Sequence, residues 1–197
     1  MEVYPGIIAT DPTVDQRAII TAAQGILLQS ALTFQLFDFS QGAMVTRSIA
    51  DMANNVPRSG VPFLTANLFG PLGALAAVFN TLNPDGTVNI GEPVYLVFDR
   101  SVLATRTTEA IASIMAHESW HVNQIYNGIM NDFVNYPRVV DIEYEAFVVG
   151  TVVWNDIKGP QTERSLDAGA GCVAAGEARC KEILVTDFGY PTGPRNG

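Results

Sequence analysis

The chain has 197 residues, of which 48% are hydrophobic, enough to bury the core of one domain without requiring a second. Its formal net charge is -9 at pH 7, and its basic residues are scattered along the sequence instead of clustered. A nucleic-acid phosphate backbone would be repelled by such a surface. The composition therefore favours a single domain over residues 1–197 and excludes nucleic acid as a partner.

The first eighty residues are predicted to form core helices. Apolar residues dominate residues 15–37, and a helix start signal precedes them at Asp11-Pro12. Two further apolar stretches cover residues 43–54 and 63–80. A membrane-spanning helix needs about 20 consecutive apolar residues, whereas the two longest runs are broken by glutamines or by the Gly70-Pro71 pair. We therefore expect buried helices and no membrane association.

A small sheet and two more helices are predicted in the remainder of the chain. Residues 83–86, Asn-Pro-Asp-Gly, are a strong turn signal, and residues 87–90 and 94–98 are typical of short strands. Helices are expected at residues 107–126 and 139–156. The fold class is therefore α+β and mainly helical, with a small β-sheet and the helix at residues 107–126 as its central element.

Two features bear on the compartment of the protein. Residues 1–5, MEVYP, lack the basic stretch and apolar run of an export signal, but a chain from which such a signal had been removed would look the same. Cys172 and Cys180 lie eight residues apart, about 12 Å in an unbroken helix, which is beyond the reach of a disulfide. They can pair only if the chain turns between them, and Gly176 permits such a turn. Both the compartment and the state of the cysteines stay open.

The helix predicted at residues 107–126 contains an HExxH motif, which runs from His117 to His121. Residues four apart in a helix lie on one face, so the two imidazoles can bind one zinc ion at about 2.0–2.1 Å. The chain has only these two histidines, and both have the required spacing. Glu118 lies to one side of the pair, where its carboxylate can take a proton from a water activated by the zinc. The motif predicts a zinc-dependent hydrolase with Glu118 as its catalytic base.

A tetrahedral zinc ion needs a third protein ligand, and no third histidine exists to provide it. The helix at residues 139–156 offers Asp141, Glu143 and Glu145. Glu143 shares its face with apolar and small residues, namely Ala146, Phe147, Gly150 and Trp154. A buried carboxylate is costly unless it is paired or bound to metal, so Glu143 is the preferred ligand. Glu145 and then Asp141 are the alternatives.

This arrangement resembles the gluzincins among the zincin metallopeptidases, in which a glutamate from a downstream helix completes the HExxH site. Residues 143–146 also look like their Glu-x-x-Ala signature, whereas Gln124 and Asn127 stand where metzincins have glycine and histidine. The resemblance implies a compact zincin-like domain that holds one zinc per chain and cleaves a peptide or protein substrate bound along the strand at residues 94–98. It departs from the pattern at Phe147, where many gluzincins have an aspartate that orients a zinc ligand.

Two other functions stay open. A lysozyme-like transglycosylase could use Glu118 as acid and base, although this leaves both histidines unexplained. An inactive, zinc-stabilised binding module would have no need of Glu118, which does not bind the metal. Candidates for stabilising an oxyanion in a peptidase are Tyr126, Tyr136, Tyr144, Tyr190 and Arg138.

Overall fold

The computed structural model describes residues 1–29, 61–70, 72–85, 87–89, 91–126, 128, 139–157 and 163–192. Its helices are α1 (Val14–Gln29), α3 (Arg100–Thr105), α4 (Thr108–Tyr126), α5 (Val139–Ile157), α6 (Arg164–Ala174) and α7 (Glu177–Thr186). Its strands are β1 (Glu2–Tyr4), β2 (Ile7–Ile8), β3 (Phe63–Ala66), β4 (Ala76–Phe79) and β5 (Tyr95–Asp99). This architecture confirms the mainly helical α+β fold class predicted from the sequence. Within the described ranges, no helix is long and apolar enough to cross a membrane.

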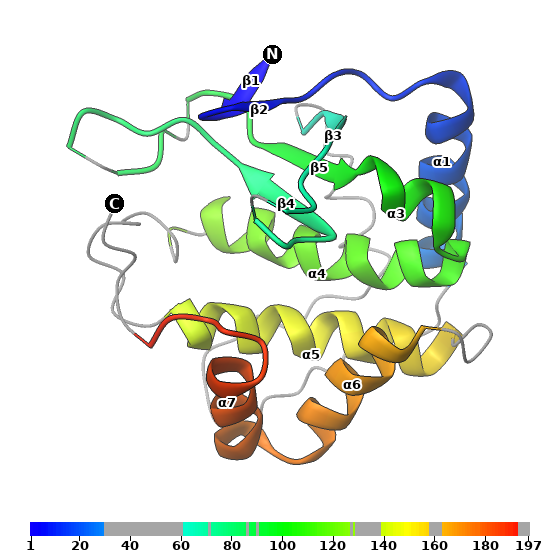
Figure 1. The fold of residues 1–197 in the computed structure, drawn as a ribbon, viewed down its shortest axis with the longest axis vertical. Coiled ribbons are helices and arrows are strands. Elements are labelled where there is room, and N and C mark those ends of the chain that lie inside the picture. Colours follow the sequence, from blue (N-terminus) through cyan, green and yellow to red (C-terminus); the bar gives the residue numbers. More distant parts are fainter. Residues whose placement is uncertain are drawn as a thin grey trace.

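Helix α4 lies in the middle of the fold, between the three-stranded sheet and helix α5 (Figure 1). On its far side, α5 packs against the C-terminal helices α6 and α7. Because α4 is covered on opposite sides, most of its residues are buried, including the polar side chains of Ser113, Glu118, His121 and Gln124. The prediction of a central helix at residues 107–126 is thus confirmed, and Thr107 caps it by accepting a hydrogen bond from the Ala110 N–H at 3.2 Å.

The sheet has the strand order β3-β5-β4, so β5 is its middle strand. Leu64 of β3 lies opposite Val97 in a parallel pairing, and Val78 of β4 lies opposite Leu96 in an antiparallel one. The strand predicted at residues 94–98 is therefore confirmed as β5. Of the strand predicted at residues 87–90, the described residues contain only an isolated bridge between Leu82 and Val88.

The helix predicted at residues 63–80 is wrong, because this stretch forms strands β3 and β4. Its apolar residues fall into two short runs, and periodicity alone cannot distinguish a short buried strand from a buried helix. Gly70 and Gly73 between them adopt φ angles of 101° and 63°, a left-handed backbone that ends any helix there. Pairing with β5 then decides the structure of both runs.

The other predicted helices, at residues 15–37, 43–54 and 139–156, are confirmed where the structure describes them. The helix expected at residues 15–37 is present as α1 up to Gln29, and residues 30–37 lie outside the described residues. The helix expected at residues 43–54 lies wholly outside them. The helix expected at residues 139–156 is α5.

Helices α4 and α5 approach each other closely at Gly150. A Cβ atom built on Gly150 would lie 3.2 Å from the Ser113 carbonyl oxygen and 3.3 Å from the Cβ of His117. The Ser113 hydroxyl also donates a hydrogen bond to the Gly150 carbonyl at 2.8 Å. The small-residue face predicted for this helix therefore brings α5 within reach of the HExxH motif.

Helices α6 and α7 were not predicted, and they settle the state of the cysteines. The chain reverses at Gly176, whose φ is 90°, and Cys172 and Cys180 form a disulfide with their Cα atoms 4.7 Å apart. Around this bond is a small apolar cluster that includes Phe147 of α5 and Tyr190 beyond α7. The disulfide thus fixes α6 to α7, and the apolar cluster packs both helices against α5.

Asp99, at the end of β5, joins three segments of the chain. Its carboxylate accepts hydrogen bonds from the N–H groups of Leu68 and Phe69, both at 2.6 Å. It also accepts one from the Ser101 N–H at 2.8 Å, and this hydrogen bond caps the start of α3. Burial raises the pKa of Asp99, but the hydrogen bonds from Ser101, Phe69 and Leu68 outweigh it and hold that pKa below its ordinary value. Asp99 therefore anchors the segment that leads from β3 towards β4.

Candidate metal centre

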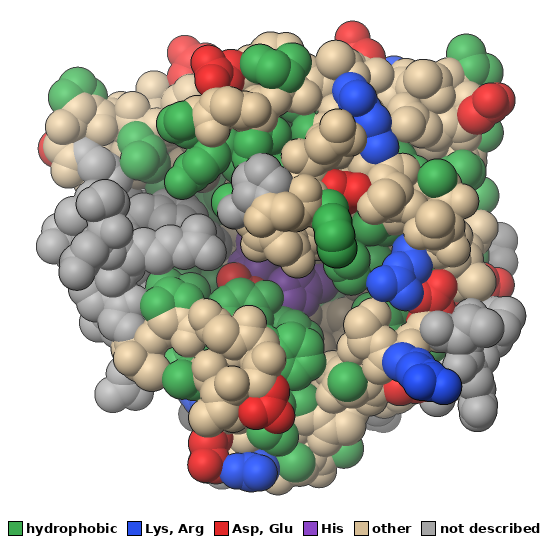
Figure 2. Space-filling view, viewed as in Figure 1, with side chains coloured by type: hydrophobic (Ala, Val, Ile, Leu, Met, Phe, Trp, Pro, Cys, Tyr) green, Lys and Arg blue, Asp and Glu red, His purple; other side chains and the backbone are tan. Residues whose placement is uncertain are grey.

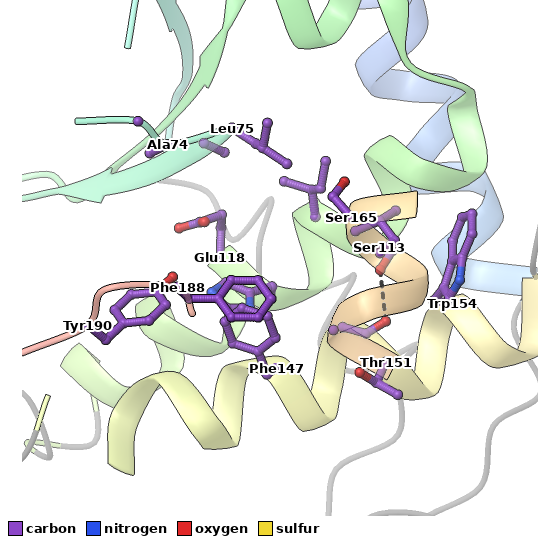
Figure 3. A pocket seen from close by; sticks show the side chains of 17 residues that line it. Ala74, Leu75, Ser113, Glu118, Phe147, Thr151, Trp154, Ser165, Phe188 and Tyr190 are labelled. Carbon is purple, nitrogen blue, oxygen red and sulfur yellow. Dashed lines mark hydrogen bonds between the residues drawn. The ribbon is translucent and has the colours of Figure 1, made fainter. Parts of the chain in front are cut away.

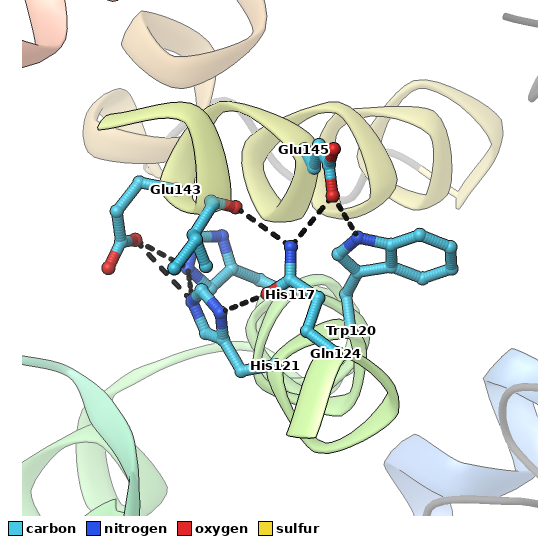
Figure 4. A network of polar contacts seen from close by, with 7 residues as sticks. His117, Trp120, His121, Gln124, Glu143 and Glu145 are labelled. Carbon is cyan, nitrogen blue, oxygen red and sulfur yellow. Dashed lines mark hydrogen bonds and ion pairs between the residues drawn. The ribbon is translucent and has the colours of Figure 1, made fainter. Parts of the chain in front are cut away.

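Three potential metal ligands converge between α4 and α5 (Figure 4). His117 and His121 lie on successive turns of α4, and their Nε2 atoms are 3.2 Å apart. Oε2 of Glu143, on α5, lies 3.4 Å from each of these nitrogens. Of the clusters that the described residues form, this is the one suited to holding a metal ion.

The spacing of the three atoms fits a tetrahedral ion. Ligand atoms at 2.0–2.1 Å from such an ion are separated by about 3.3 Å along each edge of the tetrahedron. The observed separations of 3.2, 3.4 and 3.4 Å match this edge, so one ion could contact all three atoms without rearrangement of the helices. The donor set of two imidazoles and a carboxylate is also one that zinc favours.

The electrostatics of the site favour positive charge. Burial raises the pKa of Glu143, but the neighbouring His121 and His117 outweigh it and hold that pKa far below the ordinary range. Burial lowers the pKa of His121, yet the Glu143 carboxylate, with smaller contributions from Glu118 and Gln124, raises it to about 9. A buried carboxylate that holds a proton on its neighbour is equally suited to hold a metal cation in its place.

Gln124 orients His121 from the side opposite the cluster. Its amide nitrogen donates to Oε2 of Glu145 at 2.8 Å and to the Ile142 carbonyl at 3.3 Å, and both of these groups can only accept. The Gln124 oxygen must then face His121, where it lies 2.8 Å from Nδ1. The amide therefore favours the neutral tautomer of His121 that carries its proton on Nδ1, which leaves the lone pair of Nε2 for a metal ion in the cluster.

The two alternative ligands on α5, Glu145 and Asp141, have other partners. Glu145 accepts from Gln124 and, at 3.3 Å, from Nε1 of Trp120 (Figure 4). Asp141 forms an ion pair with Lys181 at 2.7 Å. The structure thus brings Glu143 to the histidines, as preferred from the sequence, and gives Glu145 a supporting place behind Gln124. The sequence contained one signal of this network, since Gln124 follows His121 by three residues on the same helical face.

Glu118 lies beside the cluster, at a cavity of about 330 Å³ (Figure 3). Only 7% of Glu118 is exposed, and this burial raises the pKa of its carboxyl group. His117 also lines the cavity and meets the Phe147 ring edge-on, with 4.9 Å between the ring centroids. In the space-filling view the histidines are visible within a hollow bordered by hydrophobic side chains (Figure 2). The cluster is therefore accessible from one face of the molecule.

Of the proposed oxyanion-stabilising residues, Tyr190 lines this cavity. Tyr144 lies under the ammonium group of Lys181, and Tyr126 is 41% exposed at the end of α4. Tyr136 and Arg138 lie outside the described residues. Tyr190 is thus the candidate that shares a cavity with Glu118.

Comparison with known proteins adds no relative. No family model, no curated protein and no solved structure matches the chain. What can be said of its chemistry rests on the cluster of His117, His121 and Glu143, which could hold a metal ion.

Proposed function

We propose that the protein is a zinc-dependent hydrolase, most specifically a metallopeptidase similar to the gluzincins, with one zinc per chain. The observation that carries this proposal is the spacing of His117, His121 and Glu143, which matches a tetrahedral ion, with Glu118 beside them at a cavity. A structural zinc site is closed by four protein ligands, whereas a catalytic site uses three and leaves one position for substrate or water. Three ligands at a cavity support the catalytic alternative.

Each residue has a part in the proposed reaction. His117, His121 and Glu143 would hold the zinc, which when bound supplies a Lewis acid that polarises a carbonyl and lowers the pKa of water. Glu118 accepts the proton of the attacking water and returns it to the leaving amine. Burial raises the pKa of Glu118, which strengthens its carboxylate as a base. Gln124 and Glu145 keep His121 in the tautomer that ligation requires.

The place expected for the substrate needs correction. The strand at residues 94–98 is β5, which is paired on both sides and has no free edge to receive a peptide. Strands β3 and β4 are the outer strands of the sheet within the described residues, and the first residue of β4, Ala76, lines the cavity. A peptide that adds to a sheet edge beside Glu118 would therefore pair with β4.

Metal analysis of four purified proteins tests the proposal: the wild type and the Glu118→Gln, Glu143→Gln and Glu145→Gln variants. We expect one zinc per chain in the wild type and in Glu118→Gln, and loss of stoichiometric zinc in Glu143→Gln. Glu145→Gln serves as the matched control on the same helix and should retain more zinc than Glu143→Gln. Absence of zinc from the wild type, or greater loss from the Glu145 variant, would overturn the ligand assignment.

Peptide hydrolysis tests the role of Glu118. Once a screen of peptides and proteins has found a substrate, Glu118→Gln should hydrolyse it about 10²- to 10⁴-fold more slowly than the wild type while keeping its zinc. Equal rates in the two zinc-loaded proteins would refute the proposed base. Cleavage of a glycan substrate that survives chelation and disappears only with Glu118 would instead support the transglycosylase alternative.

A further inference from the structure

The cavity beside the metal cluster has a composition that points to one kind of occupant. We propose that it receives a single large, uncharged apolar side chain of the substrate and so determines specificity. This inference rests on the proposed function in naming a peptide as the substrate. The ability of the cavity to bind an apolar group is a property of the chain that can be measured without cleavage.

The walls of the cavity come from five parts of the chain and are mainly apolar. They include Leu75 ahead of β4, Ile114 of α4, Trp154 of α5, Leu166 of α6, and Phe188 and Tyr190 beyond α7. Among the described lining residues, the carboxylate and imidazole groups are those of Glu118 and His117. Figure 3 shows Glu118 towards one end of the cavity and Trp154 towards the other. The part distant from Glu118 therefore offers no charged partner.

Two polar groups in this distant part already have partners. The Trp154 Nε1–H donates to Oδ1 of Asp167 at 3.1 Å, and the Ser113 hydroxyl donates to the Gly150 carbonyl at 2.8 Å. A charged side chain entering here would lose its hydration without gaining a counter-ion, which is strongly unfavourable. An apolar side chain would instead gain the free energy of leaving water and, if aromatic, edge contacts with the surrounding rings.

The size of the cavity limits the occupant. A volume of about 330 Å³ lies at the lower end of the range of about 300–1,000 Å³ found for ligand pockets. The space therefore suits one bulky side chain next to the bond that is cleaved, and not an extended segment of substrate.

Binding of small amides to the chelated protein tests the cavity independently of zinc and of catalysis. Ligand-observed NMR would compare N-acetyl-phenylalaninamide, N-acetyl-leucinamide, N-acetyl-aspartamide and N-acetyl-lysinamide. We expect the two apolar amides to bind at millimolar concentrations, at least about tenfold more tightly than the charged ones. Equal binding of all four amides, or tighter binding of a charged one, would overturn the inference.

Variants that fill the cavity locate the binding. Ser165 of α6 and Ala74 ahead of β4 both line it, so Ser165→Trp and Ala74→Trp should each weaken binding of the phenylalanine amide by tenfold or more. Ala174→Trp is the matched control, because Ala174 is an exposed residue of the same helix as Ser165 and does not line the cavity. Circular dichroism of each variant checks that it folds. Unchanged binding in both folded filling variants would show that the amide binds elsewhere.

The same series distinguishes this inference from the proposed function. Selective binding of the apolar amides without hydrolysis of any peptide by the zinc-loaded protein would refute the peptidase and leave the apolar cavity standing. Hydrolysis with equal rates for peptides that carry alanine, phenylalanine or lysine beside the cleaved bond would refute the cavity as the specificity determinant and leave the peptidase standing.

Discussion

The close approach of α4 and α5 at Gly150 can be tested by adding a single methyl group. In an open helical position, Gly→Ala stabilises a protein by about 0.5–1 kcal/mol, because alanine loses less backbone entropy on folding. Gly171 of α6 is such a position, since a Cβ built there has no described atom within 4 Å apart from its chain neighbours and the backbone of its own helix. At Gly150 the same Cβ would lie 3.2 Å from a backbone oxygen and 3.3 Å from His117, and overpacking of this kind costs about 1–3 kcal/mol.

We therefore expect Gly171→Ala to be more stable than the wild type and Gly150→Ala to be less stable than Gly171→Ala by about 1–3 kcal/mol. Urea unfolding with linear extrapolation measures both free energies. The methyl group should also move α5 by a few tenths of an ångström and weaken zinc binding, because Glu143 lies on the same helix two turns away. Equal stabilisation by the two substitutions, with zinc affinity unchanged, would refute the close packing described for the two helices.

Three further predictions address other parts of the fold. Replacing Gln124 by leucine should lower zinc affinity by about 10- to 100-fold in a chelator competition assay, because His121 loses its orienting partner. Replacing both Cys172 and Cys180 by alanine should lower the free energy of unfolding in urea by about 2–3 kcal/mol, as expected when a short loop is no longer closed. Asp99→Asn should lower the free energy of unfolding by about 1–2 kcal/mol near pH 6. Since the pKa of Asp99 is lowered in the folded chain, its contribution is complete above the ordinary carboxyl pKa of about 4 and is lost as the pH falls through the folded value.

Each of these predictions has an outcome that contradicts it. Unchanged zinc affinity in Gln124→Leu would mean that His121 is oriented without the amide. Equal stability of the double cysteine variant and the wild type would show that helices α6 and α7 are fixed by packing alone. A difference between Asp99→Asn and the wild type that stays constant from pH 6 to pH 3 would show that the carboxylate charge does not stabilise the segment after β3.

Local periodicity explains why the centre of the site could be predicted from the sequence. The spacing of His117 and His121 within one helix fixes their relative position, and the apolar face of the next helix selects Glu143 over Glu145. The position of Gln124 between two helices depends on their packing, which no local pattern encodes. Residues 63–80 form strands because they pair with β5, and this pairing is likewise not encoded in a local pattern. The disulfide depends on a turn at Gly176 that the sequence permits but does not require.

The metal cluster and part of the cavity wall come from different segments of the chain, so substitutions can alter one without the other. The three atoms of the metal cluster come from α4 and α5, whereas Phe188 and Tyr190 reach the cavity from beyond α7, on a segment held by its own disulfide. Substitutions in this C-terminal segment can therefore reshape the cavity while the ion-binding atoms keep their positions. If the protein is the proposed peptidase, the C-terminal segment is the natural place to diversify in a library that seeks new substrates.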